Sequence, residues 1–186
     1  VLCGSGGTVE GKAAWLLEDF RSKLGCYEST AFQQVAKAMV VCRSRSDVVA
    51  YVRALRSHLC DGGDWLVLDS SFSAVRLTTA DLRYRAQACR GVCGFFSGEI
   101  DTLSETKMNS GLELHEACET ARILVVCQKL ETGYDEPRLA AMYVDRKLEG
   151  TATVVQVLSR VNRRMLGKTS AHVVDLHGGE EHAYRG

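Results

Sequence analysis

The sequence predicts an α/β domain with a mostly parallel sheet and helices on both of its faces. Short apolar runs of strand length, such as residues 123–127, carry no alternating polar positions, as is typical of strands buried on both faces. Between these runs lie segments with apolar residues at helical spacing, such as residues 9–24. Alternation of buried strands with amphipathic helices favours a parallel sheet between two helical layers.

The first half of the chain is expected to open with the helix over residues 9–24, followed by a buried strand over residues 38–42. A second helix is predicted to begin near Ser46, because serine is a favourable N-cap residue. Residues 61–79 are rich in glycine and serine and fit either a hairpin or an ordered loop, and residues 80–89 fit a further helix.

The second half is expected to supply the other strands, and a helix lies between the last two of them. The strands are predicted over residues 92–96, 123–127, 140–144 and 171–176, and the helix over residues 153–163. Functional residues of such sheets gather in the loops after the strands' carboxyl ends. Those loops are residues 43–45, 97–98 and 132–137. Residues 1–176 are expected to form one domain, with a polar tail over residues 177–186.

Composition excludes several classes of protein. The formal net charge is zero, so any contact with nucleic acid must come from local clusters of charge. No apolar stretch approaches the roughly 20 residues that span a bilayer, which predicts no membrane partner. The eight cysteines show no C-x-x-C spacing, and we expect them to be reduced in an intracellular, cytoplasmic protein. The histidines do not cluster at metal-binding spacing, so no metal site is expected in this chain.

The predicted helix over residues 153–163 carries a notable pattern of arginines. At ~100° per residue, Gln156, Arg160 and Arg163 share one face, and valines and a leucine occupy the opposite face. Guanidinium groups suit a phosphate because they are planar, permanently charged and fork-shaped. Spacing alone favours the simpler interpretation, an ordinary solvated face with charged residues.

Several motifs in order resemble the motor subunits of type I restriction enzymes and their helicase relatives in superfamily 2. They are KAMVVCRSR, FFSGEI, ILVVCQKLETGYDEP, MYVDRKLEG, VVQVLSRVNR and HVVDL. Arg146 stands where these proteins usually have lysine. The resemblance covers residues 9–176 and is weakest over residues 60–89. It implies a RecA-like fold and identifies the chain as the second, C-terminal motor domain of an ATP-dependent DNA translocase or helicase.

The resemblance also implies roles at a nucleotide site. Arg163 would be the finger that reaches the γ-phosphate of ATP bound on the first motor domain, and Arg160 would make a second phosphate contact. Gln156 would lie at the cleft between the domains. Asp135 would contact the ribose or link the ATP state to its loop, to which Gly133 also belongs.

A second group of residues is expected to contact the backbone of double-stranded DNA. Ser44 and Arg45 resemble the phosphate-gripping pair of the family, and Ser97 and Gly98 form its F-S-G element. Thr132 offers a hydroxyl in the loop after a strand. From the residues alone, Ser44 and Arg45 also fit a solvated helix start. Phosphate contacts carry no sequence information, so DNA as the partner follows from the resemblance.

The resemblance implies a second partner besides DNA, the first motor domain of the same polypeptide. ATP and Mg²⁺ are expected to bind mainly to that domain. The stretch over residues 6–13, GGTVEGKA, approaches a phosphate loop but ends in alanine, which offers no hydroxyl to magnesium. Residues 167–169, Gly-Lys-Thr, lack the first glycine of that motif, and Gly167 is expected to close the preceding helix. We therefore expect this chain alone not to hydrolyse ATP. The alternative is a non-catalytic module that binds nucleic acid or protein and keeps the fold.

Overall fold

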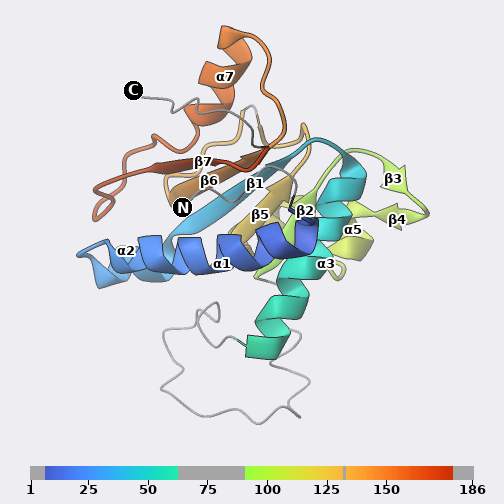
Figure 1. Cartoon of the computed structure of the whole chain (residues 1–186), viewed down its shortest axis with the longest axis horizontal. Coiled ribbons are helices and arrows are strands. Elements are labelled where there is room, and N and C mark those ends of the chain that lie inside the picture. The colour runs from blue at the N-terminus through green and yellow to red at the C-terminus, as the bar shows by residue number, and fades with distance from the viewer. Residues whose placement is uncertain (1–6, 63–90, 132, 178–186) are drawn as a thin grey trace.

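The computed structural model describes residues 7–62, 91–131 and 133–177 (Figure 1). Within them, five parallel strands form one sheet in the order β2-β5-β1-β6-β7, and β3 pairs with β4 in a small antiparallel hairpin. The strands are β1 (Lys37–Cys42), β2 (Val92–Phe95), β3 (Glu99–Ile100), β4 (Leu103–Ser104), β5 (Ile123–Val126), β6 (Leu139–Asp145) and β7 (His172–Asp175). The predicted α/β class and the five predicted strands are confirmed.

Helices cover both faces of the sheet. The helices are α1 (Val9–Gly25), α2 (Thr30–Val35), α3 (Arg45–Gly62), α5 (Glu105–Met108), α6 (Leu114–Thr120) and α7 (Thr151–Leu158). Side chains alternate along a strand, so Val40 packs with α1 and α3 on one face, and Val41 packs with α6 and α7 on the other. Figure 1 shows α1 and α3 on the side of the sheet away from α7. Both layers are apolar, which explains why the strands carry uninterrupted apolar runs.

The start of α3 differs from its prediction. The N-cap residue is Ser44 rather than Ser46: the Ser44 hydroxyl accepts a hydrogen bond from the backbone N–H of Asp47 (3.1 Å). The Asp47 carboxylate in turn accepts from the backbone N–H of Ser44 (3.1 Å). This reciprocal arrangement satisfies donors that a helix start leaves open, and it places Ser46 inside the first turn.

The predicted helix over residues 153–163 also differs, because α7 ends at Leu158 and does not reach Arg163. We call residues 159–164, which follow α7, the arginine segment. Beyond Leu158 the backbone hydrogen bonds join residues three apart instead of four. The N–H of Arg160 donates to the carbonyl of Val157, and the N–H of Asn162 donates to the carbonyl of Ser159. Such turns are common at helix ends, and the run of threonine and valine in α7 lowers its helix propensity. The predicted single helical face for Gln156, Arg160 and Arg163 is therefore wrong. Gly167, nine residues beyond the helix, does not close it.

Other expectations lie outside the described residues. They are the helix over residues 80–89, most of the loop over residues 61–79, and the tail beyond His177. The first two residues of that predicted loop are helical, since α3 runs to Gly62.

Because the strands are parallel, the sheet has two distinct ends. We call the end where the strands finish the carboxyl end; it meets residues 43–45, 97–98, 128–131 and 146–150. We call the other the amino end; it meets residues 135–138, which precede β6, and the segment after α7. The connection from β5 to β6 runs between these ends across the α6 and α7 face, where Leu130 and Tyr134 pack.

Candidate functional site

The amino end of the sheet brings the arginine segment against the loop that precedes β6. The Arg163 Nε lies 3.1 Å from the Asp135 Oδ1, and both side chains are largely exposed, at 46% and 68%. Arg160 donates from Nη1 to the carbonyl of Tyr134 (3.4 Å). Two of the predicted nucleotide contacts, Arg160 and Arg163, thus lie against the loop that holds the third, Asp135.

The remaining residues of the predicted nucleotide site are exposed. Gln156 lies on the exposed part of α7, and Gly133 has a positive φ of 74° with open space where a side chain would project. These two residues are not held by the contacts that join Arg163 to Asp135.

A buried ion-pair cluster anchors this loop. The Glu136 carboxylate, 5% exposed, lies 3.2 Å from the ammonium of Lys37, which is 2% exposed at the start of β1. Arg138 Nε donates to the same carboxylate (2.7 Å), and Arg138 Nη2 reaches Glu119 at the end of α6 (3.0 Å). Burial alone would raise the pKa of Glu136, but the hydrogen bonds from Arg138 and the charge of Lys37 outweigh it and lower that pKa to about 2. Burial lowers the pKa of Lys37.

Lys168 ties the arginine segment to the same loop. Its ammonium donates to the carbonyls of Val161 (2.6 Å), Arg163 (2.8 Å) and Pro137 (3.3 Å). Burial lowers its pKa to about 8, against a smaller raising effect of the Glu136 charge. Neither Lys168 nor the Lys37–Glu136 pair was predicted as part of the site, because their partners are backbone carbonyls or lie far along the chain.

A cavity of about 640 Å³ opens at this end. Among its lining residues are Asp135, Glu136, Arg138 and Arg164. Exposed guanidinium groups beside an open cavity can bind the oxygens of a phosphate in a forked arrangement. Arg163 is not among the lining residues, but it pairs with Asp135, which is. This ion pair is exposed to solvent and worth little, so a phosphate can displace it.

The carboxyl end brings together Arg45, Ser97 and Gly98. Arg45 donates from Nη1 to the carbonyls of Ser97 (3.2 Å) and Glu99 (3.3 Å). Gly98 has a positive φ of 81°, and a Cβ there would lie 2.9 Å from the Arg45 Nη1. Ser44 caps α3 next to this contact. Thr132, the remaining predicted residue of this group, lies outside the described residues.

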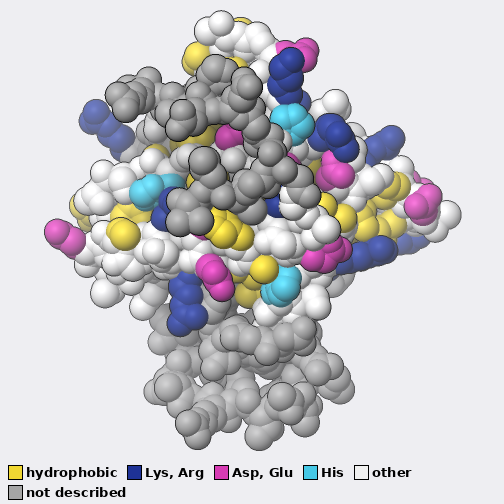
Figure 2. Space-filling model, viewed as in Figure 1, with side chains coloured by type: hydrophobic (Ala, Val, Ile, Leu, Met, Phe, Trp, Pro, Cys, Tyr) yellow, Lys and Arg dark blue, Asp and Glu magenta, His cyan; other side chains and the backbone are white. Residues whose placement is uncertain are grey.

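Charges of both signs alternate around the carboxyl end. Arg146 pairs with Glu131 at the end of β6, and Lys129 lies 2.9 Å from the Glu105 carboxylate. Figure 2 likewise shows basic and acidic side chains interspersed over the face that it draws. The described part of this end is therefore no uniformly basic surface, in line with the net charge of zero.

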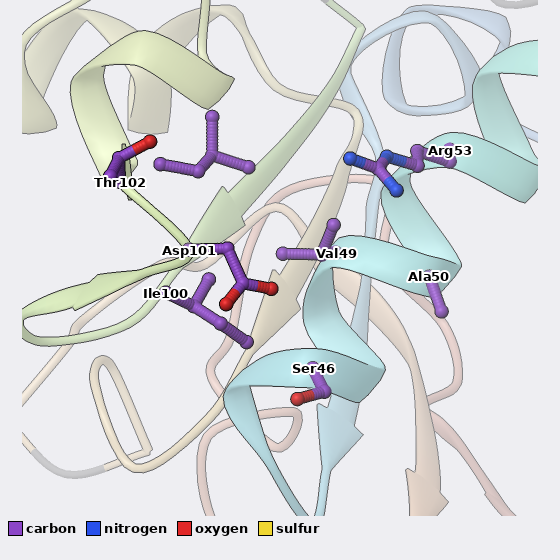
Figure 3. Close-up of a pocket in the computed structure, with 8 residues that line it drawn as sticks. Ser46, Val49, Ala50, Arg53, Ile100, Asp101 and Thr102 are labelled. Carbon is purple, nitrogen blue, oxygen red and sulfur yellow. The ribbon is translucent and has the colours of Figure 1, made fainter.

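A second cavity, of about 430 Å³, lies between α3 and the turn that joins β3 to β4 (Figure 3). Val49 and Arg53 face it from the helix, Ile100 faces it from the end of β3, and Asp101 faces it from the turn. Asp101 and Thr102 both have positive φ, 47° and 64°, as a tight two-residue hairpin requires. The cavity wall carries charges of both signs, Arg53 and Asp101, so it presents no uniformly basic site for a phosphate.

The approximate phosphate loop of the N-terminal segment has another role. Lys12 lies inside α1, and its ammonium is 2.6 Å from the Asp145 carboxylate at the end of β6, so it joins α1 to the sheet.

Over residues 7–62, 91–131 and 133–177, no group of histidine, cysteine or acidic residues is placed to hold a metal ion. Within the same residues, no helix is long and apolar enough to cross a bilayer. Cys26, Cys42, Cys118 and Cys127 are thiols and form no disulfide.

Two comparisons with known proteins give matches. Residues 96–177, which include the arginine segment and the loop before β6, match the family described as type I restriction enzyme subunit R domain 3. A relative from Methanocaldococcus jannaschii, named as the type I restriction enzyme MjaVIIP endonuclease subunit, is 40% identical over 60 residues. That match covers 32% of this chain and 6% of the relative, so the chain spans a small part of the relative's length. Residues 96–177 of this chain are therefore similar to the type I restriction enzyme subunit R domain 3 family.

Proposed function

We propose that this chain is the second RecA-like motor domain of an ATP-dependent DNA translocase. In this function Arg163 and Arg160 act on the phosphates of ATP that a first motor domain of the same polypeptide binds together with Mg²⁺. Gln156, Asp135 and Gly133 line the same nucleotide cleft. The loops at the carboxyl end of the sheet contact the DNA backbone.

The observation that carries this proposal is the contact between Arg163 and Asp135, 3.1 Å apart. It joins the two motifs that the nucleotide role needs, although they are 28 residues apart in sequence, 163 minus 135. Both side chains are exposed, as they must be to meet a nucleotide held by another domain. An arginine at this position would stabilise the negative charge that develops on the transferring phosphoryl group, an effect of about 10³–10⁵ in rate in other phosphoryl-transfer enzymes.

The separation of the two ends supports a motor rather than a simple binding module. Residues proposed to act on ATP lie at the amino end, and Ser44, Arg45, Ser97 and Gly98 lie at the carboxyl end. Thr132 lies in sequence between β5 and β6, outside the described residues. Closure of the two motor domains on ATP would then change the contacts with the DNA backbone, because one sheet connects the amino end to the carboxyl end.

The test is DNA-stimulated ATP hydrolysis by the full-length polypeptide that carries this domain, with Arg163→Ala. We expect kcat to fall by about 10³-fold or more, because the transition-state charge loses its guanidinium. The Arg163–Asp135 pair is exposed, so the free energy of unfolding should change by less than about 1 kcal/mol. The activity loss would therefore not reflect unfolding.

Arg21→Ala is the matched control, since Arg21 is an exposed arginine on α1. It should leave kcat and stability near the wild-type values. Undiminished turnover in Arg163→Ala would remove the arginine-finger role and favour the alternative, a non-catalytic binding module that keeps the fold.

A further inference from the structure

We propose that Lys168 is a positioning residue for Arg163, one that fixes the arginine segment against the loop before β6 so that the guanidinium meets the nucleotide. This inference rests on the proposed function and assigns a role to a lysine that contacts no nucleotide itself. Its basis is the set of three carbonyls that one ammonium group joins.

The three acceptors belong to two separate segments. Val161 and Arg163 stand in the arginine segment, and Pro137 stands in the loop that carries Asp135 and Glu136. A lysine ammonium has three donors, and here each can bind one carbonyl. The side chain therefore links the backbone of Arg163 directly to the loop that its guanidinium contacts.

The hydrogen bonds of Lys168 hold a stretch of backbone that the sequence predicts to be helical. Since α7 ends at Leu158, the regular helical hydrogen bonds do not hold the backbone at Arg163. The carbonyls of Val161 and Arg163 would otherwise lack the partners that a continuing helix supplies. Lys168 satisfies both of them and at the same time fixes the direction in which the segment leaves α7.

Lys168 is itself held in place from the far side. The neighbouring Gly167 has a φ of 84°, and a Cβ there would lie 2.6 Å from the Ser29 side chain, so the chain passes close against α2. Farther along, the Tyr27 hydroxyl donates to the carbonyl of Ser170 (2.9 Å). The lysine thus extends from an anchored backbone and does not move freely with the arginine segment.

The protonation of Lys168 provides a readout that a simple packing role would not. Its pKa of about 8 places loss of the proton within reach of enzyme assays. A neutral amine has two N–H donors and a lone pair, so it cannot satisfy three carbonyls. The charged group that acts on it is Glu136; the other charged side chains on the joined segments are Asp135, Arg138, Arg163 and Arg164.

The decisive experiment is a double-mutant cycle in the full-length polypeptide. Lys168→Met keeps the side-chain length and removes all three donors. We expect it to lower the kcat of DNA-stimulated ATP hydrolysis by about 10- to 100-fold, the size of a small misplacement of a catalytic group. The KM for ATP should change less than about threefold, because other residues bind most of the nucleotide.

In the Arg163→Ala background, Lys168→Met should have no further effect on kcat in single-turnover assays with excess enzyme. The same loss in both backgrounds would overturn the inference, as would wild-type turnover in Lys168→Met alongside a slow Arg163→Ala. Wild-type turnover in Arg163→Ala would instead contradict the proposed function. Lys12→Ala is the control, since it removes a comparably sheltered ammonium at the opposite end of the sheet.

A pH series on the wild-type polypeptide tests the inference without any change at Lys168. We expect kcat to fall as the pH rises through about 8, and the residual turnover of Arg163→Ala to stay level. The folded-state pKa is lowered, so deprotonation of this group relieves a cost of burial and does not decrease stability. A wild-type kcat that stays level to about pH 9.5 would overturn the inference.

Discussion

The two ends of the sheet hold their functional candidates in different ways. At the amino end, Arg163 is exposed, and buried or half-buried neighbours such as Glu136 and Lys168 keep its surroundings in place. At the carboxyl end, the candidates themselves are the structural contacts: the Ser44 hydroxyl caps α3, and the Arg45 guanidinium holds the loop after β2.

This difference decides how well function can be separated from stability. At the amino end, the exposed group can be removed while its buried support remains, and the support can be altered while the exposed group remains. At the carboxyl end, a substitution removes the proposed phosphate contact and a structural hydrogen bond together. Three substitutions test this contrast through the free energy of unfolding.

The largest expected effect is at Glu136. Glu136→Gln keeps the shape of the side chain but leaves the buried ammonium of Lys37 without its counter-charge, which should cost about 3–5 kcal/mol in urea denaturation. Glu119→Gln is the matched control, because Glu119 pairs with the same Arg138 but is 55% exposed. It should cost less than about 1 kcal/mol. Equal losses in the two variants would show that burial does not distinguish them.

Acid provides a second readout of the same carboxylate. The pKa of Glu136 is lowered from 4.5 to about 2, so its contribution is fully present above 4.5 and is lost as the pH falls toward 2. The stability difference between the wild type and Glu136→Gln should therefore shrink over this interval. A constant difference down to pH 2 would contradict the assignment.

An intermediate effect is expected at Gly167, which supports Lys168. Gly167→Ala would place a Cβ 2.6 Å from Ser29 in a backbone conformation with φ 84°. The strain and the clash together should cost about 2–4 kcal/mol in thermal or urea unfolding. Gly111→Ala separates the two causes, because Gly111 has φ 85° but nothing within 4 Å of the added Cβ. It should cost about 1–2 kcal/mol.

The smallest effect is expected at the carboxyl end. Ser44→Ala removes the N-cap of α3 and should cost about 1 kcal/mol. Ser46→Ala, two residues further and exposed, should change stability by less than about 0.5 kcal/mol. If Ser44→Ala weakens DNA binding as well, both losses should appear together, which is the behaviour that distinguishes this end. A large loss in Ser46→Ala with none in Ser44→Ala would restore the original N-cap prediction.

The sequence predicts the strands well because their signal is local. Strand β5 is covered on both of its faces, and every residue from Ile123 to Val126 is buried. The run is therefore apolar throughout and has the length of a strand. The resemblance assigns Arg163 and Asp135 to one nucleotide site, and in the structure their side chains lie 3.1 Å apart. The strand order β2-β5-β1-β6-β7 was not predicted, because pairing depends on long-range packing.

Features that depend on distant or backbone partners could not be read from the sequence. Lys37 and Glu136 are 99 residues apart, and neither residue type alone indicates that it is buried in an ion pair. Lys168 binds carbonyls, which every residue carries, so no motif marks its role. The end of α7 was not predicted, because the helical spacing of apolar residues continues past Leu158, although the helical backbone ends there.

The connection from β5 to β6 has one further consequence. Glu131 pairs with Arg146 at the carboxyl end, and Glu136 pairs with Lys37 at the amino end. Four residues lie between these two anchors, and the five steps of chain from Glu131 to Glu136 span at most roughly 17 Å when extended. The spacing between the two ends is therefore limited by covalent geometry as well as by packing.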